Sequence, residues 1–162
     1  MVEIASMPID SCLRELFPCE PTLPVNKITA WSFCRDIERE ELARHFAERR
    51  WSEFSFEEIR MEWAALYFFS CEAYVYFLPA YLSAIVHDVE ESDLLPDSLV
   101  GSLMMRKKDS FWDWCPRTPF ECLNSSQKVL LNKVLCCIRR HWLLEDWDLA
   151  QMSRIDGLIQ QC

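Results

Sequence analysis

Glu72 is the residue whose surroundings point most directly to chemistry, because it lies alone in the most apolar part of the chain. An unpaired carboxylate is costly there, so we expect Glu72 to cap backbone amides at the start of its own helix or to pair with a basic residue such as Arg60. The alternative is a functional carboxylate in a pocket lined by Tyr74, Tyr76 and Tyr81. Acid–base catalysis needs a second group within reach, and tyrosines at helical spacing are more often core, so a structural role is favoured.

Cys71 and His87 are the other residues of this region with chemical potential. A thiol at a helix start can have a lowered pKa, but the sequence places no histidine beside Cys71. His87 ends the apolar segment, where a cation complements the helix dipole, and a structural role is again favoured. We therefore predict no catalytic residue and a protein that is not an enzyme.

The nine cysteines are scattered along the chain and include no CxxC pair. Together with three histidines they show no recognisable zinc spacing, so we predict no metal and no cofactor. Most have apolar neighbours, where free thiols pack as small hydrophobic side chains. Free thiols indicate a reducing compartment. The first ten residues have neither the positive region nor the apolar run of a signal peptide, so the predicted location is the cytoplasm.

A second kind of candidate site is a surface that binds another protein. Residues 88–97 carry five carboxylates and no base, and residues 111–120 concentrate phenylalanine, tryptophan and proline. Aromatic side chains of this kind dominate binding hot spots, although they can equally fold back over the core as a lid. We predict that the two segments form one acidic and aromatic face for a cationic protein partner. The predicted partner-binding residues are Asp88, Glu90, Glu91, Asp93, Trp112 and Trp114.

The amino-acid composition excludes several classes of function. The chain has 162 residues, of which 51% are hydrophobic, and only two glycines, Gly101 and Gly157. Phosphate-binding loops, dinucleotide fingerprints and nucleophile elbows need clustered glycines, so these classes are excluded. The net charge of −9 disfavours nucleic-acid binding. The same charge would attract a basic partner, and the alternative is that it serves solubility alone.

The hydrophobic pattern is helical nearly throughout and contains no convincing strand. Capping signatures at Ser55, Ser70 and Asn124 mark three helix starts. Residues 109–123 have the composition of a loop. We predict helices over residues 4–17, 36–50, 56–69, 71 to about 91, 99–105, 125 to about 144 and 146 to about 160.

The segment that follows Ser70 is apolar on every face as far as residue 86, which is typical of a helix surrounded by others. Pro79 lies inside it, and we expect a kink or a break there. Residues 63–86 are long enough to span a bilayer. However, Glu72 divides them into two pieces that are each too short, so we predict two buried helices and no membrane association.

These segments, taken in order, resemble an uncharacterised family of small bacterial proteins known only as a domain of unknown function. The resemblance covers residues 46–142. Its hallmark is a helix ending in a Phe-Leu-Ser/Thr-like turn, then Glu-Ala-aromatic and aromatic-Leu-Pro-Ala, and Cys71 departs from it where a proline or small residue is more usual. The resemblance implies a bacterial origin and supports the fold but carries no activity. The matching stretches are 65–72 (ALYFFSCE), 73–82 (AYVYFLPAYL) and 123–127 (LNSSQ).

The sequence therefore predicts one all-α domain over residues 1–162, with roughly six or seven helices around a central apolar helix. The leading functional hypothesis is a cytoplasmic interaction protein, an immunity protein or inhibitor that blocks a basic toxin or other effector, by analogy with other small acidic inhibitors. The alternative is a small-molecule-binding protein or enzyme with a pocket around Glu72, Tyr76 and Tyr81. A third hypothesis is a module that docks within a larger complex. The oligomeric state stays open.

Overall fold

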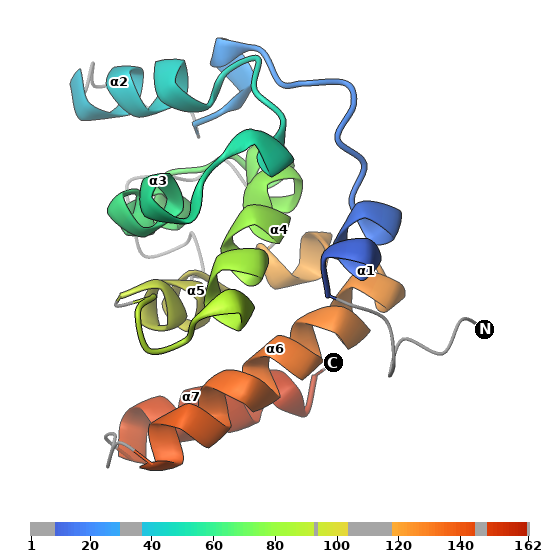
Figure 1. The fold of residues 1–162 in the computed structure, drawn as a ribbon, viewed down its shortest axis with the longest axis vertical. Coiled ribbons are helices and arrows are strands. Elements are labelled where there is room, and N and C mark those ends of the chain that lie inside the picture. The colour runs from blue at the N-terminus through green and yellow to red at the C-terminus, as the bar shows by residue number, and fades with distance from the viewer. Residues whose placement is uncertain (1–8, 30–36, 93, 104–117, 145–148, 162) are drawn as a thin grey trace.

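The protein is an all-α helical bundle, as predicted (Figure 1). The computed structural model describes residues 9–29, 37–92, 94–103, 118–144 and 149–161. Within these residues there are seven α-helices and four 3₁₀ segments, and the one β contact is an isolated bridge between Thr29 and Phe69. The α-helices are α1 (Ile9–Leu16), α2 (Ile37–Phe46), α3 (Phe56–Met61), α4 (Cys71–His87), α5 (Leu95–Leu103), α6 (Ser125–Leu144) and α7 (Leu149–Ile159). The 3₁₀ segments are η1 (Val25–Lys27), η2 (Trp51–Glu53), η3 (Trp63–Tyr67) and η4 (Phe120–Cys122).

Helix α4 occupies the centre of the bundle, as its apolar faces predict. Helices α1, α3, α5 and α6 all pack against it, and Figure 1 shows α3 and α5 on one side of α4 and α1 on the other. Residues 77–82 are buried without interruption, and successive side chains project about 100° apart around a helix. Positions on every face of one helix are therefore removed from water, which accounts for the absence of an amphipathic pattern here.

The start of α4 is fixed by Ser70, as predicted. Its hydroxyl oxygen accepts a hydrogen bond from the Ala73 amide at 3.0 Å, and the same hydroxyl donates to the Lys27 carbonyl at 2.5 Å. The cap therefore also ties α4 to the connector that precedes α2. We predicted a kink or a break at Pro79, and the break does not occur, because α4 continues through this buried residue to His87. The free energy gained by burying the apolar side chains around Pro79 offsets the loss of the backbone hydrogen bond that proline cannot donate.

The end of α3 differs from the prediction because of a tertiary contact. The helix that opens with the predicted Ser55 capping box ends at Met61, not at residue 69, and continues as the 3₁₀ segment η3. At this point the Glu62 carbonyl accepts hydrogen bonds from the Ala65 amide and the Tyr81 hydroxyl, both at 3.0 Å. The hydroxyl of Tyr81 on α4 thus donates a hydrogen bond to the backbone carbonyl at the end of α3.

The boundaries around the end of α4 also differ. Helix α4 ends at His87 and not near residue 91, because Asp88 adopts an extended conformation and its carboxylate accepts the Glu91 amide at 3.0 Å. Helix α5 begins at Leu95, four residues before the predicted start. Pro96 stands in its first turn, where a missing amide costs no helical hydrogen bond. The residues between α4 and α5 thus form a turn rather than a helical extension.

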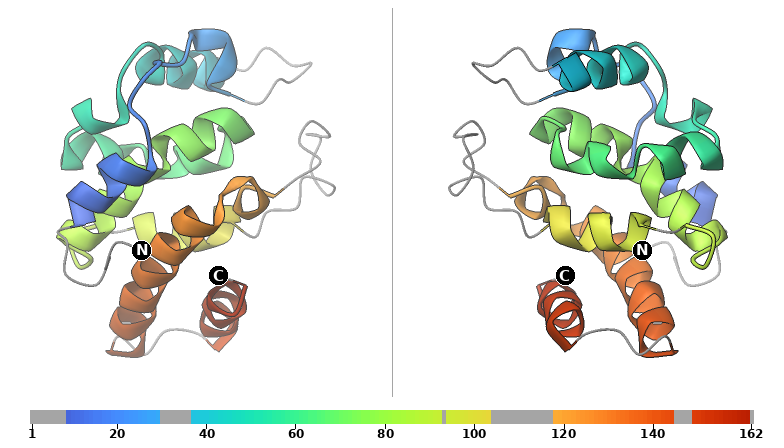
Figure 2. Two further views of the ribbon diagram at one scale, coloured as in Figure 1. Left: turned by 90° about the vertical axis from the view of Figure 1, so that its right-hand side faces the viewer. Right: turned by 90° about the vertical axis from the view of Figure 1, so that its left-hand side faces the viewer.

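The C-terminal helices pack side by side beneath α4 (Figure 2). Asn124 and Gln127 exchange backbone-to-side-chain hydrogen bonds of 3.0 and 2.9 Å, which is the predicted cap of α6. Arg139 and Asp156 form an ion pair between α6 and α7, with Nε and Oδ1 2.5 Å apart. No helix in the described part of the chain has the length and apolar character that crossing a bilayer requires.

Candidate functional site

Glu72 is neither buried nor unpaired. Its side chain is about half exposed (53%), and one carboxylate oxygen, Oε1, lies 3.0 Å from Lys27 Nζ. The expected capping role is filled by Ser70, and the expected partner Arg60 instead binds Glu57, with Nη2 and Oε2 2.9 Å apart. Glu72 sits in the first turn of α4, at the point where the apolar helix reaches the surface. Its ion pair joins α4 to the η1 segment.

A hollow of about 430 Å³ opens beside Glu72, and we call it the Glu72 groove. It lies between the connector that follows α1, the first two turns of α4, and the region where α6 begins. Phe17 and Leu23 form its buried floor, and Val75 and Tyr76 form an apolar wall. The size falls within the range of about 300–1,000 Å³ that small-molecule sites occupy.

Tyr76 belongs to this groove, whereas Tyr81 does not. The Tyr76 hydroxyl donates to the Cys19 carbonyl at 2.6 Å, and burial is the largest cause that raises the pKa of Tyr76 to about 12. Tyr81 lies nine positions after Glu72, a rotation of about 180° on a helix, and is fully buried against α3 with its pKa raised well above the usual value by that burial. Of the two roles considered for Tyr81, the structure therefore shows the core role and not a place in a pocket with Glu72.

Tyr74 is also a core residue. Its hydroxyl lies 2.8 Å from the Ser102 hydroxyl, and complete burial raises the pKa of Tyr74. The interpretation of the tyrosines as core is thus confirmed for Tyr74 and Tyr81, and Tyr76 is the one that reaches a hollow.

Cys71 departs from the expectation of free thiols, because it is disulfide-bonded. A sulfur held in a disulfide is not a nucleophilic thiol, which agrees with the expectation that Cys71 is not a nucleophile. A disulfide also runs against the reducing compartment inferred from the sequence. Four other described cysteines are free thiols, and they are Cys12, Cys19, Cys136 and Cys137.

The acidic turn, by which we mean Asp88, Glu90 and Glu91, projects from the opposite end of α4. All three residues are exposed, and no described residue forms an ion pair with any of them. Asp88 is sixteen positions from Glu72, or about 24 Å along a helix. The predicted partner-binding carboxylates and the predicted pocket around Glu72 therefore lie at opposite ends of α4. The remaining predicted partner-binding residues, Asp93, Trp112 and Trp114, lie outside the described residues.

The structure also contains a second hollow, of about 290 Å³, that the sequence analysis missed. It lies between α1, residues 51–59 and the last two turns of α4. Ser83 donates to the Asp10 carboxylate at 2.9 Å, and Arg14 adds a guanidinium group and His87 an imidazole to its lining. The one sequence signal for it was the spacing of Ala80, Ser83 and His87 on one face of α4. Its other walls come from segments far away in the sequence.

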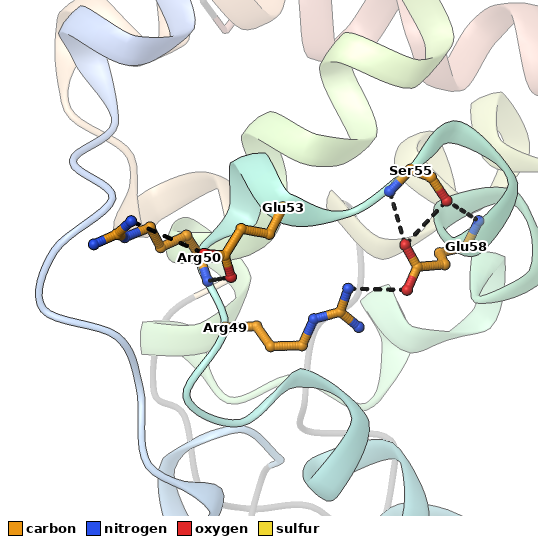
Figure 3. A network of polar contacts seen from close by, with 5 residues as sticks. All are labelled: Arg49, Arg50, Glu53, Ser55 and Glu58. Atoms are coloured by element: carbon orange, nitrogen blue, oxygen red, sulfur yellow. Dashed lines mark hydrogen bonds and ion pairs between the residues drawn. The ribbon is translucent and has the colours of Figure 1, made fainter.

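One wall of the second hollow is formed by the segment that follows α2, and a network of polar contacts stabilises this segment (Figure 3). Glu58 is its hub, because its carboxylate accepts from the Ser55 amide at 2.9 Å and from Arg49 Nη2 at 2.9 Å. The backbone bond from Ser55, followed by the Arg49 bond, lowers the pKa of Glu58 to about 2. Arg50 and Glu53 form a second capping box one turn earlier. Arg49 also lies 3.8 Å from the centre of the Phe54 ring, so the network orders this hollow's lining.

Comparison with protein families, curated proteins and solved structures gives no match for this chain. Among the described residues, no group of three or more histidine, cysteine, aspartate or glutamate side chains is arranged to hold a metal ion. The functional proposal therefore rests on the geometry of the hollows and of the acidic turn.

Proposed function

We propose that the protein acts by binding a basic protein partner and not by catalysing a reaction. The observation that carries this proposal is the acidic turn, where three exposed carboxylates have no ion-pair partner among the described residues. By contrast, Glu58 and Asp156 are neutralised by arginines within the fold. Carboxylates that remain free for a partner speed its association by electrostatic steering.

The net charge of −9 would likewise attract a basic partner. The proposed role is that of an immunity protein or inhibitor whose partner is a basic toxin or other effector. Asp93, Trp112 and Trp114 complete the proposed face: the aspartate adds charge, and tryptophans commonly anchor protein interfaces. The resemblance to small bacterial proteins of unknown function stays a prediction beside this role.

The test compares two triple variants with the same change in charge. One neutralises the acidic turn (Asp88→Asn, Glu90→Gln, Glu91→Gln), and the control neutralises three exposed residues of α2, named at the end of this paragraph. Tagged forms are used to capture partners from host lysate at low and high salt, with identification by mass spectrometry, and the association rate of the purified partner is then measured. The control substitutions are Glu38→Gln, Glu40→Gln and Glu41→Gln.

We expect one dominant basic protein whose capture weakens with salt. Its association rate at low salt should fall about tenfold when the acidic turn is neutralised, and it should change little in the α2 control. Equal association rates for both triple variants would contradict a role for the acidic turn, even if the partner itself is basic.

A second candidate function, a small-molecule-binding protein, is favoured by the Glu72 groove. The groove combines an apolar floor with carboxylates at its rim and has the volume of a ligand site. Val75→Trp separates the two functions, because a large ring would fill the groove about 20 Å along α4 from the acidic turn. Ligand binding should be lost in this variant while capture of a basic partner is unchanged. Loss of both would indicate misfolding or one shared site.

A further inference from the structure

We propose that the Glu72 groove binds a small hydrophobic cation, an aliphatic or aromatic amine whose apolar body fills the hollow and whose ammonium group reaches the rim. This inference rests on the second candidate function, that the groove is a ligand site, and adds the chemical class of the ligand. It follows from three properties of the groove. Polar side chains of its interior are already hydrogen-bonded within the fold, its rim carries carboxylates, and the charge around these carboxylates is negative.

The interior of the groove selects an apolar body. Phe17 and Leu23 at the floor are 1% and 5% exposed, so a ligand that reaches them leaves water. The polar groups of the lining are already bonded within the fold. The Tyr76 hydroxyl donates to the Cys19 carbonyl, and the Gln127 side-chain amide donates to the Leu16 carbonyl at 3.1 Å. A polar group on the ligand body would find few partners there and would lose its hydrogen bonds to water.

The rim offers hydrogen-bond acceptors from two sides. Glu72 lies on α4 and Glu20 on the connector after α1, and both line the groove. Each uses one oxygen, Oε1, for its own cation: Lys27 Nζ is 3.0 Å from Glu72, and Arg50 Nε is 2.6 Å from Glu20. The second oxygen, Oε2, accepts no hydrogen bond from a described residue in either case. Since a carboxylate can accept several hydrogen bonds, an ammonium group can be added without breaking either ion pair.

The local charge selects a cation over an anion. Lys27 and Glu72 form one neutral ion pair, whereas Arg50 is shared by two carboxylates, Glu20 and Glu53, so this second cluster carries one negative charge in excess. The cluster is therefore short of one positive charge, and an ammonium group makes it neutral. A ligand carboxylate would instead add a fourth negative charge at the same rim. We assign the missing charge to a small molecule, because the hollow has the volume of a ligand site.

The test uses three probes that share a six-carbon chain and differ in the head group: n-hexylammonium, 1-hexanol and hexanoate. Each is titrated into the full-length protein, and the methyl signals of Val75 and Leu23 are followed by two-dimensional NMR. Hexylammonium should bind about two- to fivefold more tightly than hexanol, and hexanoate most weakly. Shortening the amine by one methylene should weaken binding about fourfold.

Two glutamate variants assign the preference to the rim. Glu72→Gln should bring hexylammonium down to the affinity of hexanol, whereas Glu90→Gln removes the same charge from the acidic turn and should leave the preference intact. Far-UV circular dichroism checks that each variant is folded. If Glu72→Gln unfolds, Glu20→Gln replaces it, with the same expected loss of preference.

Each other outcome overturns a defined part of the inference. Equal binding of hexylammonium and hexanol, with Val75 and Leu23 perturbed by both, would leave the groove as a ligand site and refute the choice of a cation. A failure of all three probes to perturb these methyl groups would refute the ligand site itself. Undiminished binding to Val75→Trp would place the amine elsewhere and would also refute the proposal.

Discussion

Gly101 allows a sharp test of how α5 packs against η3. A Cβ atom built at Gly101 overlaps the hydroxyl of Tyr67, and the neighbouring ring carbon Cζ is 3.4 Å away. Tyr67 is half-buried and its hydroxyl is hydrogen-bonded to Ser98, so the ring can move aside only by disturbing that bond. Gly101→Ala therefore introduces a contact that the present packing has no room for.

The size of the effect follows from opposing contributions. Overpacking costs about 1–3 kcal/mol, and a disturbed hydrogen bond adds about 0.5–1.5 kcal/mol. Alanine in place of glycine within a helix returns about 1 kcal/mol. We expect Gly101→Ala to lower the free energy of unfolding by about 0.5–3.5 kcal/mol.

Gly157 in α7 is the matched control. A Cβ atom there meets nothing within 4 Å, so only the gain in helix propensity remains. Gly157→Ala should raise the free energy of unfolding by about 0.5–1 kcal/mol. The same substitution at the two glycines of the chain is thus expected to have effects of opposite sign.

Urea denaturation and thermal unfolding measure both changes, and a difference of 1 kcal/mol corresponds to about 2–4 °C in Tm for a chain of this size. Tyr67→Phe removes the hydroxyl that the new methyl group would overlap. In this background Gly101→Ala should cost less than it does in the wild-type protein. If Gly101→Ala stabilises the protein as much as Gly157→Ala, the described packing of α5 against η3 is wrong.

Three further predictions concern a cap, the core and pH. Ser70→Ala removes the α4 cap and should cost about 1–2 kcal/mol in urea denaturation, whereas exposed Ser126 should tolerate alanine within about 0.5 kcal/mol. Leu82→Ala leaves a cavity at a fully buried position and should cost about 2–5 kcal/mol in the same assay. The folded-state pKa of Glu58 is about 2 against an ordinary 4.5, so its stabilisation is present above pH 4.5 and is lost as pH falls toward 2. Chemical denaturation across this window should therefore show a shallower decline for Glu58→Gln, and parallel curves would contradict the Arg49 and backbone contacts.

The starts of α3, α4 and α6 were predictable from the sequence because capping is a local interaction. Ser55, Ser70 and Asn124 each bond an amide three residues ahead, and this spacing is visible without the fold. The central position of α4 was predictable for a related reason, since a helix that is apolar on every face must be surrounded.

The contacts that shape the candidate site were not predictable, because they join residues distant in the sequence. Lys27 pairs with Glu72 across 45 positions, and the Tyr76 hydroxyl reaches the Cys19 carbonyl across 57. The early end of α3 has the same origin, since the Glu62 carbonyl is bonded by a tyrosine of α4. Helical periodicity alone, however, was sufficient to separate Tyr81 from Glu72, because nine residues turn a helix through about half a revolution.

The division of α4 into a buried middle and two polar ends also explains why both proposed functions fall where they do. A side chain in the middle of α4 is surrounded by other helices, so a change there alters stability before it alters recognition. At its first turn the apolar helix meets Glu72 and Lys27, and after its last turn the chain meets Asp88. Only at these ends does apolar surface adjoin charge that a ligand or partner can reach. Function is therefore best tested by conservative substitutions at the ends, with Leu82→Ala as the comparison that reports stability alone.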